Sequence, residues 1–247
     1  MMGLNILFPV LNEHGRLRSG IVRTVEYMQE YVASHPGVDY VCTILDNGSD
    51  DDTPDIGLSL EKEYPDRVRY VRIEERGVGV AFRTGVEQNK ADIVGYMDID
   101  LSTDINTLGH AVELFENDPG LEYINGSRFS KDSRTIGRKW YRKITSAGLV
   151  FLLKTLLGMK ATDAICGFTF MRAPVASRLV KQAGNDKGWF YMIELLLRAE
   201  RMGIAILDLP VTFTENYDTT VKIGKTIKNY IVNIVRLRKV FKDDKKN

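Results

Sequence analysis

The first 120 residues alternate between short apolar runs and stretches with helical periodicity, and this alternation constrains the fold most strongly. Strand-like runs at 5–10, 40–45, 68–73 and 93–97 alternate with helical patterns at 17–33, 55–64, 80–89 and 107–116. Such an order predicts βαβ units, and therefore an α/β fold with a mostly parallel central sheet flanked by helices. In sheets of this kind, ligands bind beyond the C-terminal ends of the strands.

The second half of the chain has a less regular order. Strand patterns at 122–125, 167–172 and 204–211 are interspersed with helical patterns at 141–157, 190–202 and 226–241. We find neither an internal repeat nor a low-complexity linker. The sequence therefore predicts one globular unit over residues 1–215 and a helical tail over 216–247.

Composition excludes several classes of protein. The 247 residues carry a formal net charge of +1, so no global field points to nucleic acid. Cys42 lies in an apolar run, and the two cysteines indicate buried thiols rather than a disulfide framework. The N-terminus has no basic region typical of a signal peptide, and the longest apolar window, 147–159, is interrupted by Lys154 and too short to cross a bilayer. We expect a cytoplasmic protein without a membrane span.

The stretch YMDIDLSTD, residues 96–104, places two carboxylates where an apolar run ends. Asp98 and Asp100 have three interpretations: a solvated turn, an acid/base pair, or ligands for a hard cation. Two carboxylates at a strand end suit Mg²⁺ or Mn²⁺, since these ions take few protein carboxylates and complete their shell with water and phosphate. The triplet alone leaves the choice open, and Asp104 is also a candidate helix cap.

The surrounding segments resemble a known family. In chain order they are FPVLNE (8–13), LDNGSDDDT (45–53), RGVG (76–79), YMDID (96–100), GSR (126–128), DAICGF (163–168) and WFYMIEL (189–195). Together they resemble the family 2 glycosyltransferases of the GT-A fold, inverting enzymes that use nucleotide-diphosphate sugars. Within that family they look like the polyprenyl-phosphate branch, the dolichyl-phosphate glucose and dolichyl-phosphate mannose synthases. The resemblance covers residues 4–215.

The resemblance implies a donor site in residues 1–120. The family's first nucleotide-contacting loop corresponds to Pro9, Asn12 and Glu13. The family's carboxylate that recognises the nucleotide base corresponds to Asp46. The loop near the diphosphate corresponds to Arg76, Gly77 and Gly79, where small residues allow a close backbone approach. Val78 departs from the lysine common there. Asp98 and Asp100 match the motif that binds the metal, Mg²⁺ or Mn²⁺, and the sugar diphosphate.

The acceptor half, residues 121–215, is interpreted through the chemistry of phosphate. A phosphate monoester is already largely dianionic at pH 7, so it needs cations to position it more than a base to activate it. Arg128, Arg142 and Ser146 match positions that bind the lipid phosphate in the similar synthases. A solvated basic helix start is the alternative for this segment.

Two carboxylates of this half are further candidates for the catalytic site. Asp163 matches a family carboxylate that positions donor or acceptor. Glu194 matches one that orients the acceptor or acts as a base, although Met192 departs from the residue often seen two positions earlier. They complete the candidate catalytic set with Asp98 and Asp100.

Two helical segments raise the question of membrane contact. The apolar stretch 144–159 follows Trp140 and Tyr141, which is typical of a segment lying at a lipid interface but also of a core helix. The C-terminal stretch 226–246 is amphipathic, with a basic face, and has three interpretations: packing on the domain, pairing in a homodimer, or lying on anionic lipid. We expect peripheral attachment at the cytoplasmic face of a membrane, directly or through a membrane-protein partner.

These observations predict an inverting hexosyltransferase. Its donor is a UDP-glucose-like sugar or GDP-mannose, and its acceptor is polyprenyl phosphate of the dolichyl or undecaprenyl type. The first alternative keeps the donor but uses a sugar or protein hydroxyl, with Glu194 or Asp163 as base. The second is a catalytically silent nucleotide-sugar-binding protein, suggested by Val78, Met192 and Thr220, which depart from the family pattern.

Overall fold

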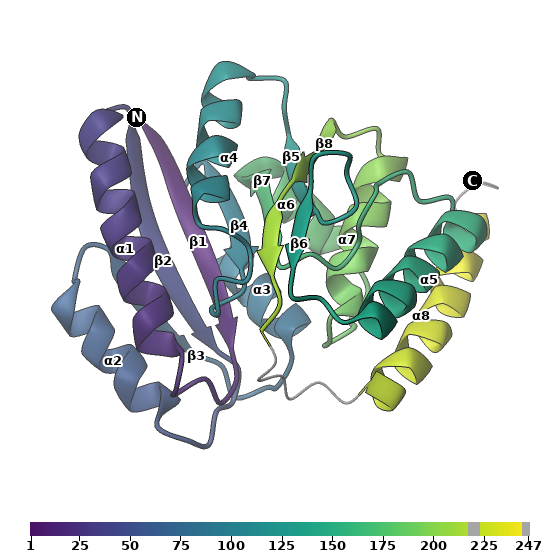
Figure 1. The fold of residues 1–247 in the computed structure, drawn as a ribbon, viewed down its shortest axis with the longest axis horizontal. Helices are drawn as coiled ribbons and strands as arrows, with labels where there is room; N and C mark the ends of the chain where they lie inside the picture. Colours follow the sequence, from purple (N-terminus) through teal and green to yellow (C-terminus); the bar gives the residue numbers. More distant parts are fainter. Residues whose placement is uncertain (217–222, 244–247) are drawn as a thin grey trace.

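The computed structural model describes residues 1–216 and 223–243, with the backbone alone for 223–227. Its centre is a seven-stranded sheet in the order β3-β2-β1-β4-β7-β5-β8 (Figure 1). The strands of this sheet are β1 Met2–Val10, β2 Val38–Asp46, β3 Val68–Arg72, β4 Ile93–Met97, β5 Tyr123–Ser127, β7 Phe168–Arg172 and β8 Ile206–Pro210. The helices are α1 Leu17–Ser34, α2 Thr53–Glu63, α3 Val78–Glu87, α4 Asn106–Asn117, α5 Trp140–Leu157, α6 Ala173–Gln182, α7 Phe190–Arg201 and α8 Ile223–Asp243.

The direction of the strands decides which loops meet. Strands β1 to β4 are mutually parallel and β5 pairs in parallel with β8, whereas β7 runs antiparallel between β4 and β5. Met97, the last residue of β4, is therefore level with Phe168, the first residue of β7. The loop that precedes β7 consequently lies at the same sheet edge as the segments that follow β1, β2, β4 and β5. The predicted mostly parallel sheet is confirmed.

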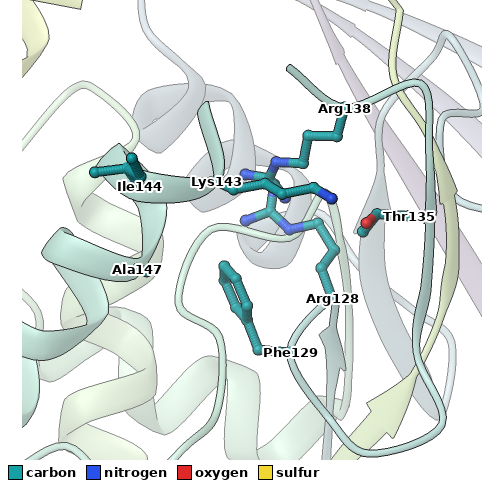
Figure 2. Close-up of a pocket in the computed structure, with 7 residues that line it drawn as sticks. All are labelled: Arg128, Phe129, Thr135, Arg138, Lys143, Ile144 and Ala147. Carbon is teal, nitrogen blue, oxygen red and sulfur yellow. The ribbon is translucent and has the colours of Figure 1, made fainter. Parts of the chain in front are cut away.

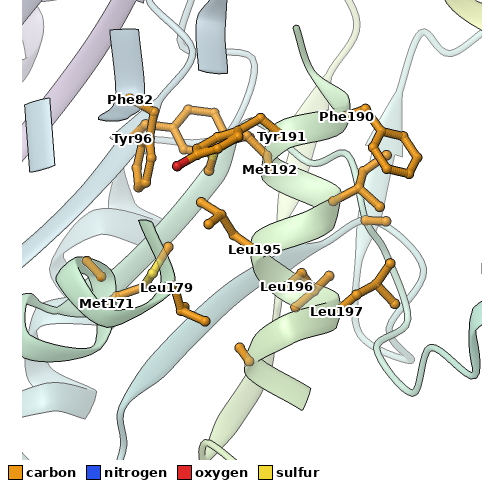
Figure 3. Packing of buried hydrophobic residues seen from close by; sticks show 14 of the residues in the cluster. Phe82, Tyr96, Met171, Leu179, Phe190, Tyr191, Met192, Leu195, Leu196 and Leu197 are labelled. Carbon is orange, nitrogen blue, oxygen red and sulfur yellow. The ribbon is translucent and has the colours of Figure 1, made fainter. Parts of the chain in front are cut away.

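Helices cover both faces of the sheet because each presents one apolar stripe. On one face, α1 and α4 bury Leu17, Ile21, Val112 and similar side chains in a single hydrophobic cluster. On the other, α3, α6 and α7 form a second cluster. Figure 3 shows its centre, where Tyr191 and Leu195 of α7 lie beside Phe82 and Tyr96.

The last helix packs on the body of the protein. Helix α8 lies along α5 (Figure 1) and also contacts α7, and it buries Ile234, Leu237 and Phe241. Among the interpretations of the tail, packing on the domain is therefore observed for the part of it that the structure describes. Ile231 and Val235 nevertheless remain exposed on α8, as does Phe151 on α5. Within residues 1–216 and 223–243, no helix is long and apolar enough to cross a membrane.

Three elements were not predicted from the sequence. Strands β6 Arg134–Ile136 and β9 Thr212–Thr214 pair in parallel as a small second sheet, and α6 begins at an Ala-Pro pair. The apolar run 204–211 reads as one strand, but β8 ends at Pro210, whose nitrogen has no hydrogen to donate to the ladder. The chain then continues into the second sheet, which reaches the segment after Asp100, since Thr214 N–H donates to the Ser102 carbonyl at 2.8 Å.

Candidate active site

The segments after β1 and β2 are joined by a network centred on Asn12. This residue has a positive φ of 56°. Its backbone N–H donates to Ser49 Oγ at 2.9 Å, and its side chain exchanges two hydrogen bonds with Asp50. Pro9, within β1, is level with Leu45 of β2. The two strand ends therefore form one connected rim.

Glu13 is part of the same rim. Its backbone N–H donates to Thr53 Oγ1 at 2.8 Å, and its carboxylate accepts a hydrogen bond from Arg16 Nε at 2.8 Å. Burial raises the pKa of Glu13, and the neighbouring Arg16 offsets this effect in part. The Arg16 guanidinium also lies 3.8 Å from Asp100 Oδ2, so it links the segments after β1 and β4.

Asp46, the last residue of β2, is completely buried and fully engaged. Oδ1 accepts the Ser49 backbone N–H at 2.9 Å, while Oδ2 accepts hydrogen bonds from Tyr70 Oη and Arg72 Nη1, both at 2.7 Å. Burial by itself would raise the pKa of Asp46, but these hydrogen bonds outweigh it and lower the pKa. The carboxylate therefore stays ionised. Because Asp46 is 0% exposed, a nucleotide base can contact it directly only if a neighbouring group moves aside.

The loop 76–79 is held from two sides. Arg76 Nε donates to the Gly48 carbonyl at 3.1 Å, and Arg76 Nη2 lies 3.0 Å from Asp50 Oδ2. A Cβ on Gly77 would lie 2.1 Å from the Lys187 carbonyl oxygen, and φ of Gly77 is +139°. A Cβ on Gly79 would lie 2.6 Å from the carbonyl oxygen of the residue before Lys187. In this structure the two glycines thus leave room for the backbone of the loop before α7. The sequence pattern predicts instead that they leave room for the diphosphate.

Asp98 and Asp100 stand together at the end of β4. Asp98 fits because residue 167 is a glycine: a Cβ there would lie 1.7 Å from Asp98 Oδ2. Burial, and next the charge of Asp100, raise the pKa of Asp98 to about 7, while Arg128 acts in the opposite direction. Asp100 Oδ1 accepts the Ser102 backbone N–H at 3.0 Å, and its Oδ2 has Arg16 as a distant partner. Negative charge on this pair is therefore only partly compensated.

The residues present fit a hard divalent cation that shares its shell with a substrate. Mg²⁺ is usually held by one or two carboxylates together with waters and substrate phosphates. Asp98 and Asp100 supply two adjacent carboxylates, and a cation between them would relieve the repulsion that raises the pKa of Asp98. Among the described residues, no group of three or more histidine, cysteine, aspartate or glutamate side chains could enclose a metal by itself. That donor set matches an ion that needs the substrate's phosphates.

Arg128 and Asp163 form a buried, two-pronged ion pair. Arg128 Nε and Nη2 lie 2.7 and 3.0 Å from the two oxygens of Asp163, whose side chain is 0% exposed. Asp163 also accepts backbone N–H groups from Arg128, Ala164 and Ile165. Burial would lower the pKa of the Arg128 guanidinium, but Asp163 outweighs this and raises it. Arg128 thus directly follows β5, and one edge of its guanidinium fork is already occupied by Asp163.

The basic segment that leads into α5 contains a residue, Arg138, that the sequence pattern did not single out. Arg138 Nη2 donates to Ser146 Oγ at 2.6 Å, and its Nε lies 3.8 Å from Glu215 Oε2. The predicted phosphate ligand Arg142 donates instead to Glu215 Oε1. Glu215 immediately follows β9, and the pairing of β6 with β9 brings it here. The signal available in the sequence was the clustering of cations over 138–143, which does not distinguish one arginine from another.

Arg128 and Arg138 line a cavity of about 330 Å³. Figure 2 shows their guanidinium groups side by side, with the Lys143 ammonium nearby and the Phe129 ring on the opposite side. Ile144 and two smaller side chains complete the wall. The cavity thus combines three cationic side chains with the apolar Phe129, Ile144 and Ala147, a lining that suits a phosphate attached to a hydrocarbon chain.

Glu194 lies away from this cavity in a different set of contacts. Its side chain is fully buried, and its carboxylate is paired with Arg198 of α7 and Arg236 of α8 and accepts the Gly184 backbone N–H. Burial would raise the pKa of Glu194, but the bond from Arg236, the Gly184 N–H and the bond from Arg198 together lower it. These contacts favour an anchor for α8 over a free base. Met192 is buried in the core cluster, and Thr220 lies outside the described residues.

Comparison with known proteins gives three consistent matches. A family model, Glycosyl transferase family 2, matches residues 6–180. Glycosyltransferase AglD of Haloferax volcanii is 30% identical over 237 residues, covering 94% of this chain and 36% of that protein. Dolichyl-phosphate beta-glucosyltransferase of Homo sapiens is 26% identical over 219 residues, covering 86% of this chain and 67% of that protein. The chain therefore spans about a third to two thirds of the length of these curated relatives.

Solved structures resemble the fold. Glucosyl-3-phosphoglycerate synthase from Mycobacterium tuberculosis, in complex with Mn²⁺, UDP and glucosyl-3-phosphoglycerate, superimposes with a TM-score of 0.63 at 17% identity, over 96% of this chain and 80% of that one. The same enzyme in complex with Mg²⁺ and UDP gives a TM-score of 0.63 at 17% identity, over 96% and 79%. These likenesses confirm the predicted GT-A architecture.

Proposed function

We propose that this chain, which belongs to glycosyl transferase family 2, transfers a hexose from a nucleotide-diphosphate sugar to the phosphate of a polyprenyl phosphate. The observation that carries the proposal is the adjacency of two unlike sites at one sheet edge. One is the pair Asp98 and Asp100, and the other is the cationic cavity lined by Arg128 and Arg138. Electrostatic contact between Asp98 and Arg128 joins the two.

The donor would lie over the rim formed by the segments after β1, β2 and β4. Asn12, Glu13 and Asp46 belong to the part of the rim assigned to the nucleotide, and Arg76 to the part assigned to the diphosphate. Asp98 and Asp100 would hold Mg²⁺ or Mn²⁺, the ions named in complexes of the similar mycobacterial enzyme. Such an ion, when bound, offsets the negative charge that develops on the departing diphosphate.

The acceptor would place its phosphate at the cations of the cavity and its hydrocarbon chain along the apolar Ile144. A phosphate oxygen then attacks the anomeric carbon of the hexose from the side opposite the diphosphate. The new carbon–oxygen bond forms as the bond to the β-phosphate oxygen breaks, and its electron pair leaves with the nucleoside diphosphate. The configuration at the anomeric carbon is inverted. No proton has to be removed, because the phosphate is largely dianionic at neutral pH.

A hydroxyl acceptor is disfavoured by the state of the two carboxylates that would serve as base. Asp163 is engaged by Arg128 and backbone N–H groups, and Glu194 is engaged by Arg198 and Arg236. A general base must reach the proton it removes and needs a free lone pair to take it. The phosphate acceptor has no such requirement, so we retain it as the proposed substrate class.

Peripheral contact with a lipid surface is part of the proposal. Apolar side chains stand exposed on the neighbouring helices α5 and α8, among them Trp140 at 73% and Phe151 at 66% exposure. Ile144 belongs both to this surface and to the wall of the cavity, so a hydrocarbon chain could pass from one to the other. Tryptophan and cations beside apolar side chains are typical of segments at the membrane interface.

Sugar transfer tests the proposed reaction. Radiolabelled UDP-glucose and GDP-mannose are each offered with Mn²⁺, a short-chain polyprenyl phosphate and, in parallel, hydroxyl acceptors. We expect label in the lipid phosphate product and its loss in Asp98→Asn. Product with hydroxyl acceptors alone would refute the acceptor class. Tight nucleotide binding with neither transfer nor donor hydrolysis would favour a silent nucleotide-sugar-binding protein.

Co-sedimentation with liposomes tests the membrane contact. The wild-type chain should sediment with vesicles that contain anionic lipid, and the double variant Phe151→Glu/Val235→Glu should stay in the supernatant. Leu58→Glu on α2 is the matched control, because Leu58 is an exposed apolar residue outside α5 and α8. Equal sedimentation of wild type and double variant would contradict the assigned surface.

A further inference from the structure

Arg138 is buried yet incompletely bonded. Its side chain is 3% exposed, and its Nε and Nη1 atoms have no hydrogen-bond partner among the residues that the structure describes. Its third nitrogen, Nη2, is the one that donates to Ser146. Buried donors without acceptors are costly, and a buried charge is costlier still unless it is paired. The environment of Arg138 is therefore incomplete in a way that an anion would complete.

The neighbouring arginines each have a carboxylate partner within hydrogen-bond distance. Arg128 is bound in two-pronged fashion by Asp163, and Arg142 donates to Glu215. Arg138 Nε lies 3.8 Å from Glu215 Oε2, beyond hydrogen-bond distance, and within residues 1–216 and 223–243 this oxygen accepts no hydrogen bond. Burial lowers the pKa of the Arg138 guanidinium, and the charge of Arg128 lowers it further. Arg142 Nε is also buried without a partner among the described residues, but Arg142 does not line the cavity. Of the two arginines that do, Arg138 is the one whose buried donors are unpaired within the described part of the chain.

The charge of the cluster also matches a particular ligand. The cluster contains four cations, Arg128, Arg138, Arg142 and Lys143. In the ion pairs described for them the partners are two carboxylates, Asp163 and Glu215, which leaves two positive charges. A phosphate monoester carries about two negative charges at pH 7, whereas a diester carries one. The cluster therefore complements the acceptor before transfer better than the product after transfer.

Glu215 occupies a position between the two sites. It lines a hollow that also contains Asp100 and Ser102, and its carboxylate reaches Arg142 on the acceptor side. The Glu215 backbone N–H donates to the Ile136 carbonyl at 3.0 Å, which fixes the residue against β6. A carboxylate at this junction repels any anion that enters the cavity, and it holds Arg142 in place.

We propose that Arg138 is the residue that binds the acceptor's phosphate through Nε and Nη1, and that Glu215 limits the cavity's excess charge to that of a dianion. This inference rests on the proposed function, because it names the residues that select the acceptor in that reaction. It differs from the expectation drawn from the sequence pattern, in which Arg128 and Arg142 are the phosphate ligands. Arg128 would instead form part of the cavity wall, and Arg142, paired with Glu215, would add positive charge beside it.

The test measures binding apart from turnover. Calorimetric titration with a short-chain prenyl phosphate is performed on wild type, Arg138→Gln, Arg138→Lys and Glu215→Gln. Arg138→Gln should weaken binding about 10- to 100-fold, the range for loss of hydrogen bonds from a charged donor. Arg138→Lys should recover part of the loss, since it keeps the charge but not the planar fork. Glu215→Gln should tighten binding, about 3- to 10-fold, because a nearby negative charge is removed.

The opposite signs separate a binding role from a structural one. If Arg138 and Glu215 merely held the loops together, both Gln variants would weaken binding, and that result would overturn the proposal. Arg134→Gln, an exposed arginine on β6, is the matched control and should leave prenyl phosphate affinity unchanged. A thermal shift with UDP or GDP and Mn²⁺ establishes that each variant retains its fold. Should Arg138→Gln fail to fold, Arg138→Lys and Glu215→Gln still give opposite signs.

Failure of this inference is distinguishable from failure of the proposed function. If wild type transfers sugar to polyprenyl phosphate and Arg138→Gln has the same acceptor KM, the role of Arg138 is refuted and the proposed reaction is not. Wild type that binds prenyl phosphate through Arg138 without transferring sugar to it would refute the reaction and leave the binding residue standing. The steady-state readout expected here is a rise in acceptor KM with little change in donor KM.

Discussion

Replacement of Gly167 by alanine should disable the Asp98/Asp100 site without unfolding the protein. The new Cβ would lie 1.7 Å from Asp98 Oδ2 and 2.1 Å from Asp98 Cγ, whereas real Cβ atoms essentially never approach another heavy atom within 3.0 Å. The φ of Gly167 is not in the left-handed region, so the backbone itself accepts alanine. The carboxylate must therefore retreat, by about 1.3 Å to reach that limit.

The magnitude follows from the size of this displacement. A misplacement of about 1 Å at reacting groups costs roughly 100-fold in rate, so kcat should fall by about two orders of magnitude. Overpacking itself costs about 1–3 kcal/mol of the free energy of unfolding, which most domains tolerate. The loss of activity should therefore exceed what partial unfolding explains.

The assay compares initial rates of hexose transfer at several Mn²⁺ concentrations, with thermal unfolding measured on the same samples. Gly37→Ala is the matched control, because its Cβ would meet only Glu116, at an ordinary 3.7 Å. A Gly167→Ala enzyme with a wild-type kcat and unchanged Mn²⁺ dependence would refute the assignment of Asp98. An enzyme that is slow only because it is unfolded would show a collapsed melting temperature.

Three further predictions concern Glu194, the acceptor's ionisation and Asp46. Glu194→Gln should lower the free energy of unfolding by about 1–3 kcal/mol, below the range for a fully buried pair because the Arg236 side chain is 37% exposed. The pKa of Glu194 is lower in the folded state than in the unfolded state, so this stabilisation is present above the unfolded-state pKa and is lost as pH falls through the folded-state pKa. The difference in melting temperature between wild type and variant should therefore shrink in acid. Acceptor affinity in calorimetric titrations should fall as pH drops below about 6, where the phosphate monoester gains a proton, and a pH-independent affinity would contradict the charge match. Tyr70→Phe removes one donor from Asp46 and should change the affinity for UDP or GDP more than the kcat, whereas an effect confined to kcat would count against a nucleotide-binding role.

The first half of the fold was predictable because each element carries its own periodic signal. Strand β4 lies at 93–97 as predicted, and α1 differs from its predicted range by one residue. The small sheet of β6 and β9 was not predictable, since three-residue strands have no period to detect. Nor does an apolar pattern give strand direction, and it is the antiparallel β7 that brings Gly167 to Asp98.

The site was predictable in its carboxylates but less so in its cations. Asp98 and Asp100 follow directly from a strand end, so local sequence places them. The state of the arginines depends on partners far along the chain: Arg128 on Asp163, and Arg142 on Glu215. Glu194 was assigned to the reaction by its motif, while its observed partners, Arg198 and Arg236, tie α7 to α8. Only the tertiary contacts indicate which cation remains for a substrate.

Phosphorus NMR of the reaction mixture tests the central claim most directly, because it observes the bond that is formed. The enzyme is incubated with nucleotide-diphosphate hexose, Mn²⁺ and short-chain polyprenyl phosphate, and the Mn²⁺ is removed before the spectrum is recorded. The phosphate monoester signal should be replaced by a phosphodiester signal as nucleoside diphosphate accumulates in equal amount. Accumulation of nucleoside diphosphate beside an unchanged monoester signal would contradict the account, since the hexose would then have gone to water or to a hydroxyl group.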